Sequence, residues 1–381
     1  RGATSINGGS PLVLVDGAQM DINNINPQDI ESVTVLKDAA SAAIYGARAA
    51  FGVILVTTKK GDKNSKPKVT YSGNFYASSP TIIPNKADSY KYALYINSMR
   101  QNAGQSIIFD DVNLGLIKDR VEGRIDTDYS LTPSGTSYYM HANNNWADQV
   151  FADAAPGQNH NLSVSGGSDK TAYRASFAYA KENGIVTLGD DFYERFNFNT
   201  NLSTQINSWL KTSFQVNFAR AEQDLHNLPG GGFGPSIFHV TWRARPTEVP
   251  YYDIDGVPVQ SFSRLNPVAT IENGGRDNSV NYNLNTKAGV EMNWGDFSVL
   301  SNFTFNPKFN NRQQNHKQFY SVSPAANFNI NKDAEASYID KVNQVNTYYA
   351  FDMYGKYAHD WASGHSVQAT LGYNQEMATF T

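Results

Sequence analysis

A regular alternation of apolar and polar residues runs through most of the chain after residue 68. From Val280 to Glu291, every second residue is apolar or Thr, and the residues between them are Asn, Lys, Gly and Glu. Successive side chains of a β-strand point to opposite faces, so this pattern predicts strands with one apolar face and one polar face. We expect about nine such strands, at residues 69–77, 159–167, 173–179, 192–204, 210–218, 280–291, 297–306, 344–358 and 365–378.

The lengths of these segments and of their connections favour a membrane β-barrel. Each segment covers roughly the 9–11 residues that a tilted strand needs to cross a bilayer. Strands of a soluble β-sandwich, which is the alternative, have a mode near 5–6 residues. The connections alternate in length, as the periplasmic turns and outer loops of an outer-membrane barrel do. Short connections are expected at residues 166–170, 206–209, 294–296 and 360–364, and long ones at 80–157, 183–191, 220–277 and 307–342.

The composition suits a surface that meets lipid on one side and water on the other. Charged residues make up 17% of the chain, below the roughly 25% that is usual for a soluble domain. The net charge of −4 gives no basic footprint for nucleic acid. No apolar run approaches the ~18 residues of a transmembrane helix. The absence of cysteine excludes disulfides and thiolate metal sites.

Residues 1–61 follow a different pattern, which is typical of a small α/β module. The Ala-rich segment 39–50 predicts a helix that Gly46 interrupts. The module is too small to bury an independent core comfortably. Short apolar strands are predicted at residues 12–15, 30–36 and 52–57.

Both ends of the sequence suggest a piece of a longer protein. The chain begins at Arg1, without an initiator Met, inside a segment with the pattern of folded sequence. An odd, open set of strands does not close into a barrel. We therefore expect further barrel strands beyond Thr381.

The motifs of residues 1–61 resemble, in their order, the plug domain of TonB-dependent outer-membrane transporters. They are Arg1-Gly2-x-x-Ser5-Ile6-Asn7-Gly8, Pro11-Leu12-Val-Leu-Val-Asp16-Gly17, Asn26-Pro27-x-Asp29-Ile30-Glu31-Ser32, Ile44-Tyr45-Gly46-x-Arg48, and Gly52-Val53-Ile54 through Gly61. Later segments resemble the SusC/RagA branch in particular. They are Trp146-x-x-x-Val150-Phe151, residues 158–168, Arg195-Phe196-Asn197 and Trp209-Leu210-Lys211.

The resemblance implies a large transmembrane β-barrel with an α/β plug inside its lumen, of about 22 strands in the whole protein. Residues 1–61 would be the C-terminal part of the plug, and residues 62–381 the N-terminal part of the barrel with its long extracellular loops. The location it implies is the outer membrane of a Gram-negative bacterium of the Bacteroidota type.

The function implied by the resemblance is active import of a large nutrient, with an oligosaccharide as the first choice and a peptide as the second. TonB, acting through a segment absent from this chain, would pull on the plug, and a SusD-like lipoprotein would cover the barrel as a lid. The family often forms a dimer of transporter–lid pairs in outer-membrane lipid. No covalent chemistry and no cofactor are implied. The alternatives are a secretion-associated or structural barrel and, less favoured, a soluble β-rich enzyme that acts on glycans.

Aromatic residues in the long connections are candidate contacts for the substrate or the lid, because aromatic rings stack on sugars and anchor interfaces. Packing within the loops is the alternative, and we favour it. The candidates are Phe233, Phe238, Trp242, Tyr251, Tyr252, Tyr138 and Tyr139, with Trp146 beside the last two.

Charged residues of the plug-like module are candidates for ion pairs with the barrel that release under force. Simple solvation is an equally favoured alternative for them. These residues are Glu31, Lys37, Asp38 and Arg48.

Motifs for phosphate or metal binding are incomplete in this sequence. The Gly-rich segment 228–235 lacks the Lys-Ser/Thr of a phosphate-binding loop. Asp253-x-Asp255-Gly256 lacks the closing Glu of a calcium loop. The His residues contain no pair at i, i+4. We therefore expect no metal site.

Overall fold

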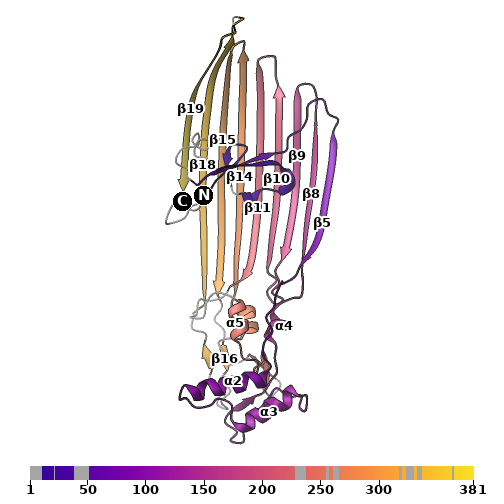
Figure 1. Ribbon diagram of the computed structural model, residues 1–381, viewed down its shortest axis with the longest axis vertical. Helices are drawn as coiled ribbons and strands as arrows, with labels where there is room; N and C mark the ends of the chain where they lie inside the picture. Colours follow the sequence, from indigo (N-terminus) through magenta and orange to yellow (C-terminus); the bar gives the residue numbers. More distant parts are fainter. Residues whose placement is uncertain are drawn as a thin grey trace.

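The alternating segments form one large antiparallel sheet, which we call the wall. Its nine strands each pair with their neighbours in this series, in the order β5-β8-β9-β10-β11-β14-β15-β18-β19 (Figure 1). The predicted set of long strands is therefore confirmed. The structure, a computed structural model, describes residues 11–20, 22–37, 51–227, 237–254, 257–260, 266–316, 320–322, 330–332, 337–362 and 364–381.

The wall strands are longer than predicted, mainly at the end that carries the long connections. For example, β14 has 19 residues and β18 has 23. The added residues are largely polar. A prediction based on alternating apolar residues therefore ends these strands too early. The strands are β5 (Lys68–Ser78), β8 (Ala155–Gly167), β9 (Thr171–Asn183), β10 (Phe192–Gln205), β11 (Leu210–His226), β14 (Arg276–Trp294), β15 (Phe297–His316), β18 (Tyr338–Asp360) and β19 (Ser366–Phe380).

Cross-strand ion pairs stabilise these polar extensions. Arg276 Nε lies 2.9 Å from Asp224 Oδ1, and its Nη1 lies 3.0 Å from Asp191 Oδ1. The predicted long connections are corrected accordingly: the last two begin later and end earlier than expected, and the first two differ from the prediction by three residues or fewer at each end. They span residues 79–154, 184–191, 227–275 and 317–337.

The two faces of the wall have opposite chemistry. On one face, Phe177 and Phe198 are cross-strand neighbours and are 49% and 42% exposed. On the other face, Asn199, Asn217 and Asn285 are successive cross-strand neighbours, and all three are buried. A soluble sheet buries its apolar face, so this exposed apolar face is the one suited to lipid.

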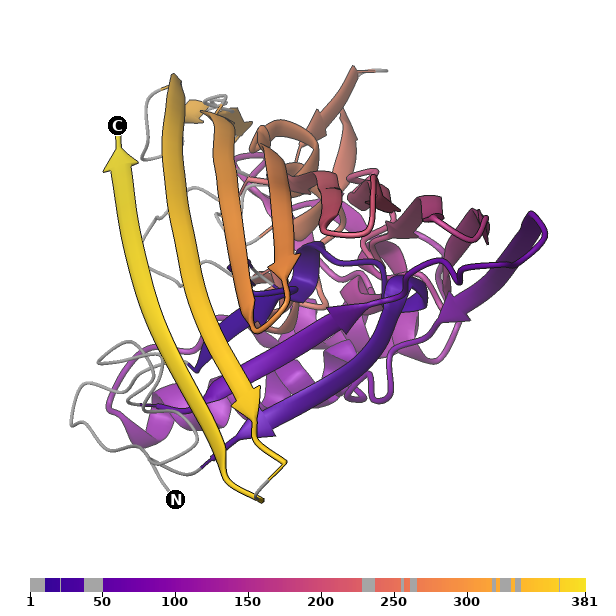
Figure 2. The same ribbon diagram turned by 90° about the horizontal axis from the view of Figure 1, so that it is seen from above.

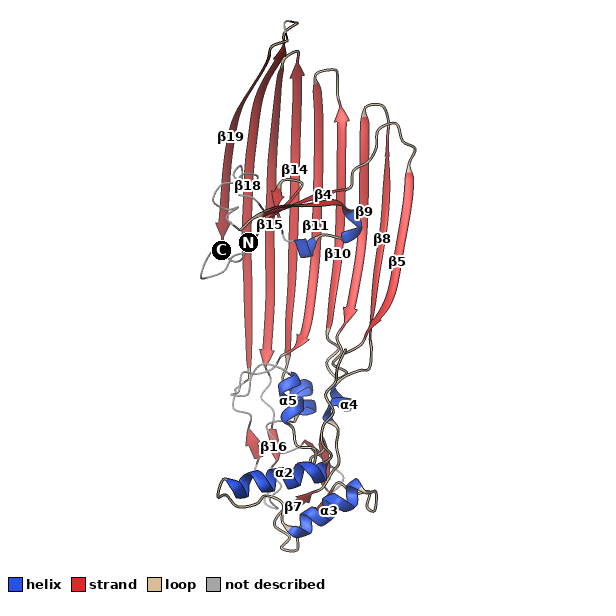
Figure 3. Ribbon diagram, viewed as in Figure 1, coloured by secondary structure: helices blue, strands red, loops and turns tan. Residues whose placement is uncertain are grey.

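The connections divide between the two ends of the wall, with the short turns at one end and the long connections at the other (Figure 1). The helices of the long connections lie beyond the strand ends (Figure 3). The sequence pattern missed α2 and α3, although Asp88 and Asp110 are good helix N-caps and accept hydrogen bonds from Lys91 N and Asn113 N. These elements are β6 (Tyr129–Leu131), β7 (Tyr138–Met140), α2 (Ser89–Asn102), α3 (Asp111–Val121), α4 (Trp146–Val150), α5 (Ile237–Arg243), β12 (Tyr251–Ile254), β13 (Val257–Gln260), α6 (Pro267–Asn273), β16 (Tyr320–Val322) and β17 (Ile330–Lys332).

The N-terminal residues form a separate four-stranded sheet, the small sheet, in the order β2-β1-β4-β3. Strands β1 and β4 are parallel, and β3 is antiparallel to β4. The three predicted strands are confirmed, whereas the helix predicted at residues 39–50 lies outside the described residues. The elements are β1 (Leu12–Val15), β2 (Ala18–Gln19), η1 (Ile22–Asn24), η2 (Pro27–Asp29), β3 (Ile30–Leu36) and β4 (Val53–Thr58).

The small sheet lies against the polar face of the wall, which is curved when seen from above (Figure 2). Its core is formed by Val15, Met20, Ile25 and Val56. Among the helices that the structure describes, none combines the length and the apolar character that a membrane crossing requires.

Candidate functional site: the contact between the small sheet and the wall

A buried ion pair joins the small sheet to the wall. Arg174 Nη2 on β9 lies 2.7 Å from Asp29 Oδ1 at the end of η2, and the two side chains are only 11% and 3% exposed. Ser176 Oγ donates a 2.7 Å hydrogen bond to the other oxygen of Asp29. Asn26, the N-cap of η2, donates to Asn161 Oδ1 at 2.8 Å. A charge-assisted hydrogen bond that is shielded from water is stronger than one between neutral groups.

A second carboxylate of the small sheet, that of Asp16, is held from both sides. Asp16 has a φ of 49° in the turn that leads from β1 to β2. Within the small sheet, Thr58 donates to it from its backbone N at 3.0 Å and from its Oγ1 at 2.6 Å. From the wall, Gln215 Nε2 donates to the same carboxylate, and Lys287 Nζ donates to the Asp16 carbonyl at 2.9 Å.

Amide side chains of the wall complete the contact. Asn201 Nδ2 donates to Thr58 Oγ1 at 3.2 Å and to the Lys59 carbonyl at 3.3 Å. Asn197 and Asn306 donate to the carbonyls of Asn24 and Gln19, at 2.7 Å and 3.0 Å. The small sheet is thus held to the wall by hydrogen bonds and an ion pair, which break and re-form without covalent change.

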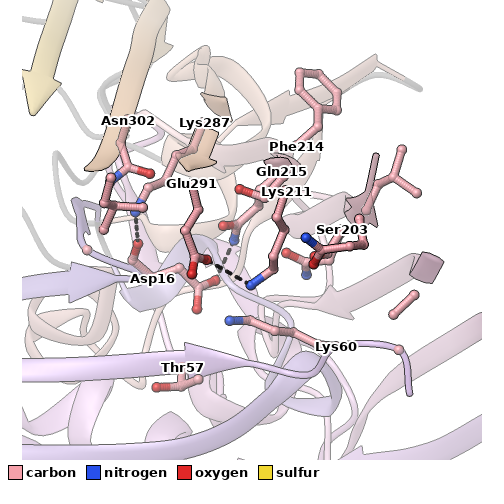
Figure 4. A pocket seen from close by; sticks show the side chains of 18 of the residues that line it. Asp16, Thr57, Lys60, Ser203, Lys211, Phe214, Gln215, Lys287, Glu291 and Asn302 are labelled. Carbon is pink, nitrogen blue, oxygen red and sulfur yellow. Dashed lines mark hydrogen bonds and ion pairs between the residues drawn. The ribbon is translucent and has the colours of Figure 1, made fainter. Parts of the chain in front are cut away.

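Two cavities adjoin this contact. The first, of about 870 Å³, lies between the small sheet and the wall, and its lining includes Lys60, Lys211, Lys287 and Glu291 (Figure 4). Lys211 Nζ lies 3.1 Å from Glu291 Oε2. The second cavity, of about 650 Å³, also has Lys287 in its lining. The Lys287 side chain therefore borders both spaces while it holds Asp16.

The two predicted ion-pair residues that the structure describes are not part of this contact. Glu31 and Lys37 are exposed, and Asp38 and Arg48 lie outside the described residues, so their pairing stays a prediction. Asp29 was not among the predicted ion-pair residues. The available signal was its place at the end of the Asn26-Pro27-x-Asp29 turn, where Asn26 caps the helical turn.

The predicted aromatic residues are divided between two loop clusters. Phe238 stacks on Phe151 with ring centroids 4.7 Å apart, yet it remains 47% exposed. Trp242 packs against the same cluster. Trp146 is fully buried, and its Nε1 donates to the Arg245 carbonyl at 2.9 Å. These contacts agree with loop packing and leave Phe238 as an accessible ring.

The tyrosines among the candidates have polar or aromatic neighbours. Tyr251 is 40% exposed and donates from its Oη to Glu272. Tyr139 Oη donates to Asp110 Oδ2 at 3.2 Å, and the Tyr138 ring lies 6.0 Å from that of Tyr129. Phe233 and the side chain of Tyr252 lie outside the described residues.

Polar groups also tie the long connections to one another. Lys86 Nζ donates to the carbonyls of Thr241, at 3.3 Å, and of Ala244. Burial lowers the pKa of Lys86 to about 8, and nearby Glu248 opposes this shift. Within the described residues, no group of His, Asp or Glu side chains is arranged to hold a metal ion.

Comparison with known proteins links the chain to one kind of receptor. The family described as TonB-dependent Receptor Plug Domain matches residues 1–53. TonB-dependent receptor P26 of Formosa agariphila is 31% identical over 83% of this chain and 29% of its own length. TonB-dependent receptor SusC of Bacteroides thetaiotaomicron is 32% identical over 53% of this chain and 18% of its own length. The chain thus spans less than a third of either relative.

The fold has a close counterpart among solved structures. The RagAB peptide importer in its closed-closed state matches 97% of this chain and 42% of its own chain, with a TM-score of 0.70 and 18% identity. That likeness shows that the small sheet and the wall share the fold of the corresponding part of that structure. Together with the plug match and the SusC-like relatives, it shows that this chain belongs to the SusC/RagA type of TonB-dependent transporter, with a plug resting on part of a β-barrel wall.

Proposed function

We propose that this chain is the plug-and-wall part of an outer-membrane importer that moves a large nutrient by TonB-dependent active transport. The observation that carries the proposal is the non-covalent contact between plug and wall, in which Asp29 and Asp16 of the plug are held by wall side chains. A plug held in this way closes the lumen at rest, and a pull on the plug opens a path without any covalent bond being cleaved. No covalent chemistry is part of the proposal.

An oligosaccharide is the preferred cargo, and a peptide is the second choice. The polar face of the wall is rich in uncharged amides such as Asn199, Asn217 and Asn285, which donate and accept hydrogen bonds. Hydroxyl groups of a sugar match both roles without requiring a charged partner. The similarity in fold to a peptide importer supports the second choice.

A SusD-like surface lipoprotein is the proposed lid. The long connections pack into a layer beyond the strand ends, at the end of the wall opposite the short turns (Figure 1). Packing between α4, α5 and α6, through residues such as Val150, Ile237 and Ile271, gives this layer its own core. Such a layer offers a firm surface for a lid, and Phe238 is an accessible anchor on it. We also propose that two transporter–lid pairs form a dimer.

The proposed division of the chain follows the two sheets. Residues 1–61 belong to the plug, and residues 62–381 belong to the barrel. TonB would act on the plug. The proposed location is the outer membrane of a Gram-negative bacterium, with the apolar face of the wall in lipid.

Uptake measurements test the proposal directly. Cells that produce the transporter are offered labelled oligosaccharides and, separately, labelled peptides, with and without functional TonB. TonB-dependent accumulation of the oligosaccharide is expected. Accumulation that is equal in both strains contradicts active import and favours a passive or secretion-associated barrel.

Native mass spectrometry of the protein in mild detergent tests the lid and the cargo together. A co-purifying acylated lipoprotein in equal amount is expected, with a bound glycan. A bare barrel contradicts the lid, and a bound peptide replaces the first choice of cargo with the second.

A further inference from the structure

Four wall side chains that hold the plug lie on one level of the wall. Asn201 on β10 is the cross-strand partner of Arg174 on β9 and of Gln215 on β11, and Gln215 is the partner of Lys287 on β14. Directly paired residues of an antiparallel sheet project from the same face. The four side chains therefore form a continuous row across four adjacent strands, which we call the anchor row.

The contacts of the anchor row are connected to the end of β4, directly or through one plug residue. Asn201 binds Thr58 and Lys59 directly. Gln215 and Lys287 bind Asp16 (Figure 4). The Asp16 carboxylate accepts a hydrogen bond from Thr58 Oγ1. Asp16 and the last residues of β4 are thus each bound to the wall, and they are also bound to each other.

Arg174, at the other end of the anchor row, is also connected to the end of β4. Arg174 pairs with Asp29, whose carbonyl accepts a hydrogen bond from Lys59 N at 2.8 Å. Asp29 is 2% exposed and Thr58 is fully buried, so water does not compete for these contacts. Buried charge-assisted contacts are the hardest of the plug–wall contacts to break one at a time, because each leaves a charge without a partner.

The position of the row along the chain gives it a mechanical role. The chain leaves β4 at Thr58 and enters the first wall strand at Lys68, so the plug residues that Asn201 binds, Thr58 and Lys59, lie directly before this short linker. A force applied to the plug reaches this linker only after the contacts of the anchor row have broken. The two cavities beside the contact show that the space around it is not closely packed.

We propose that the anchor row keeps the end of β4 fixed on the wall throughout the transport cycle, so that the cargo path opens elsewhere in the plug. This inference rests on the proposed function. It assigns Arg174, Asn201, Gln215 and Lys287 as positioning residues, which hold one edge of the plug while the rest responds to TonB.

A reversible tether tests the inference. The natural chain has no cysteine, and Asn201 Nδ2 lies 3.2 Å from Thr58 Oγ1. The double variant Thr58→Cys/Asn201→Cys places two thiols at this contact against a clean background, and loss of free thiol on oxidation verifies that they have joined before uptake is compared. With the transporter in its own membrane, TonB-dependent uptake is compared after oxidation and after reduction. The expected result is equal uptake in both states. Loss of uptake on oxidation that returns on reduction overturns the inference.

The controls separate this inference from the proposed function. The single variants Thr58→Cys and Asn201→Cys show what each substitution does without a tether. The reduced double variant is also exposed to a water-soluble thiol reagent, with and without functional TonB. Because residue 201 lines the first cavity, some labelling is expected, and it is expected to be equal in both strains; labelling that increases with functional TonB overturns the inference. This labelling requires no cargo, so it decides the question even where TonB-dependent uptake, and with it the proposed function, fails.

Discussion

At the residue scale, the ion pair between Asp29 and Arg174 differs from the exposed ion pairs elsewhere in the chain. An exposed pair such as Lys91 with Asp88 contributes little, because water screens both charges. The Asp29 and Arg174 side chains are 3% and 11% exposed, so each depends on the other for its partner. The contribution of this pair to stability is the free energy lost when one partner is removed, rather than a net free energy gained when the pair forms.

Replacing Arg174 by Met is expected to destabilise the plug–wall contact by about 3–5 kcal/mol, because it leaves the buried Asp29 carboxylate without a cation. Thermal unfolding in detergent, followed by fluorescence or by protease sensitivity of the plug, measures the change. Arg174→Lys is the matched control, since it retains the charge, and a smaller loss is expected. Equal stability of the Met variant and the natural protein contradicts this account.

Lys86 gives the layer of long connections a pH dependence. Burial lowers its pKa from 10.5 to about 8 in the folded protein. Between these two values the folded state binds fewer protons than the unfolded state, so the free energy of unfolding rises with pH across this window. Below pH 8 the buried ammonium is charged in both states, and its contribution no longer changes.

Amide hydrogen exchange of residues 237–244 checks this expectation. Exchange of these amides requires local opening of the segment. After correction for the intrinsic exchange rate, their exchange is expected to become slower as the pH rises from 8 to 10.5. Lys86→Met removes the titrating group and is expected to flatten the dependence. If the opening of this segment in the natural protein changes as little with pH as it does in the Met variant, the lowered pKa of Lys86 is contradicted.

At the element scale, the central wall strands have one apolar face suited to lipid and one polar face toward the plug. Residues Phe198 and Asn199 are adjacent on β10, yet the first is 42% exposed and the second is 8% exposed. The period of two places adjacent residues on opposite faces. A substitution in such a strand therefore has opposite requirements at neighbouring positions.

The variant Phe198→Arg is expected to reduce insertion of the folded barrel, at a cost of about 2–4 kcal/mol if the site lies at the middle of the bilayer. Phe198→Leu keeps an apolar side chain and is expected to insert normally. The folded fraction in lipid, measured by heat-dependent migration on a gel, compares the two. Equal insertion of the Arg and Leu variants contradicts the assignment of this face to lipid.

At the scale of the whole molecule, the two ends of the wall have different tasks. Short turns at one end join adjacent strands with few residues, whereas the long connections at the other end build a layer with its own core. Segments from different connections meet in that core, as Phe151 does with Phe238. The plug lies against the polar face of the wall, between these two ends.

The substitution Phe238→Ala is expected to weaken uptake or lid binding, because truncating one of the few residues that anchor an interface costs about 2 kcal/mol or more. The matched control is Tyr95→Ala, which removes an exposed ring on α2 that is 66% exposed. Co-purification of the lid and TonB-dependent uptake are measured, with barrel assembly verified for both variants. If the two variants behave alike, Phe238 has no special contact with lid or cargo.

The candidate site was only partly predictable from the sequence. The polar character of Asn199, Asn201 and Gln215 follows from the alternation, and it indicated a polar inner face. The identity of the plug residue in the ion pair did not follow, since Asp29 and Glu31 are both acidic and lie two residues apart. Only the η2 turn, which buries Asp29, and the nearby β9 strand distinguish the two.

The sequence by itself determined the strand pattern, the two chemically different faces and the division into a small module and a long wall, because these depend on neighbours along the chain. The tertiary structure decided the ends of the strands, the packing of the long connections and the anchor row. Arg174 and Asp29 are 145 residues apart in the sequence. Their contact depends on the register of several strands and on where the plug rests, and no local pattern contains that information.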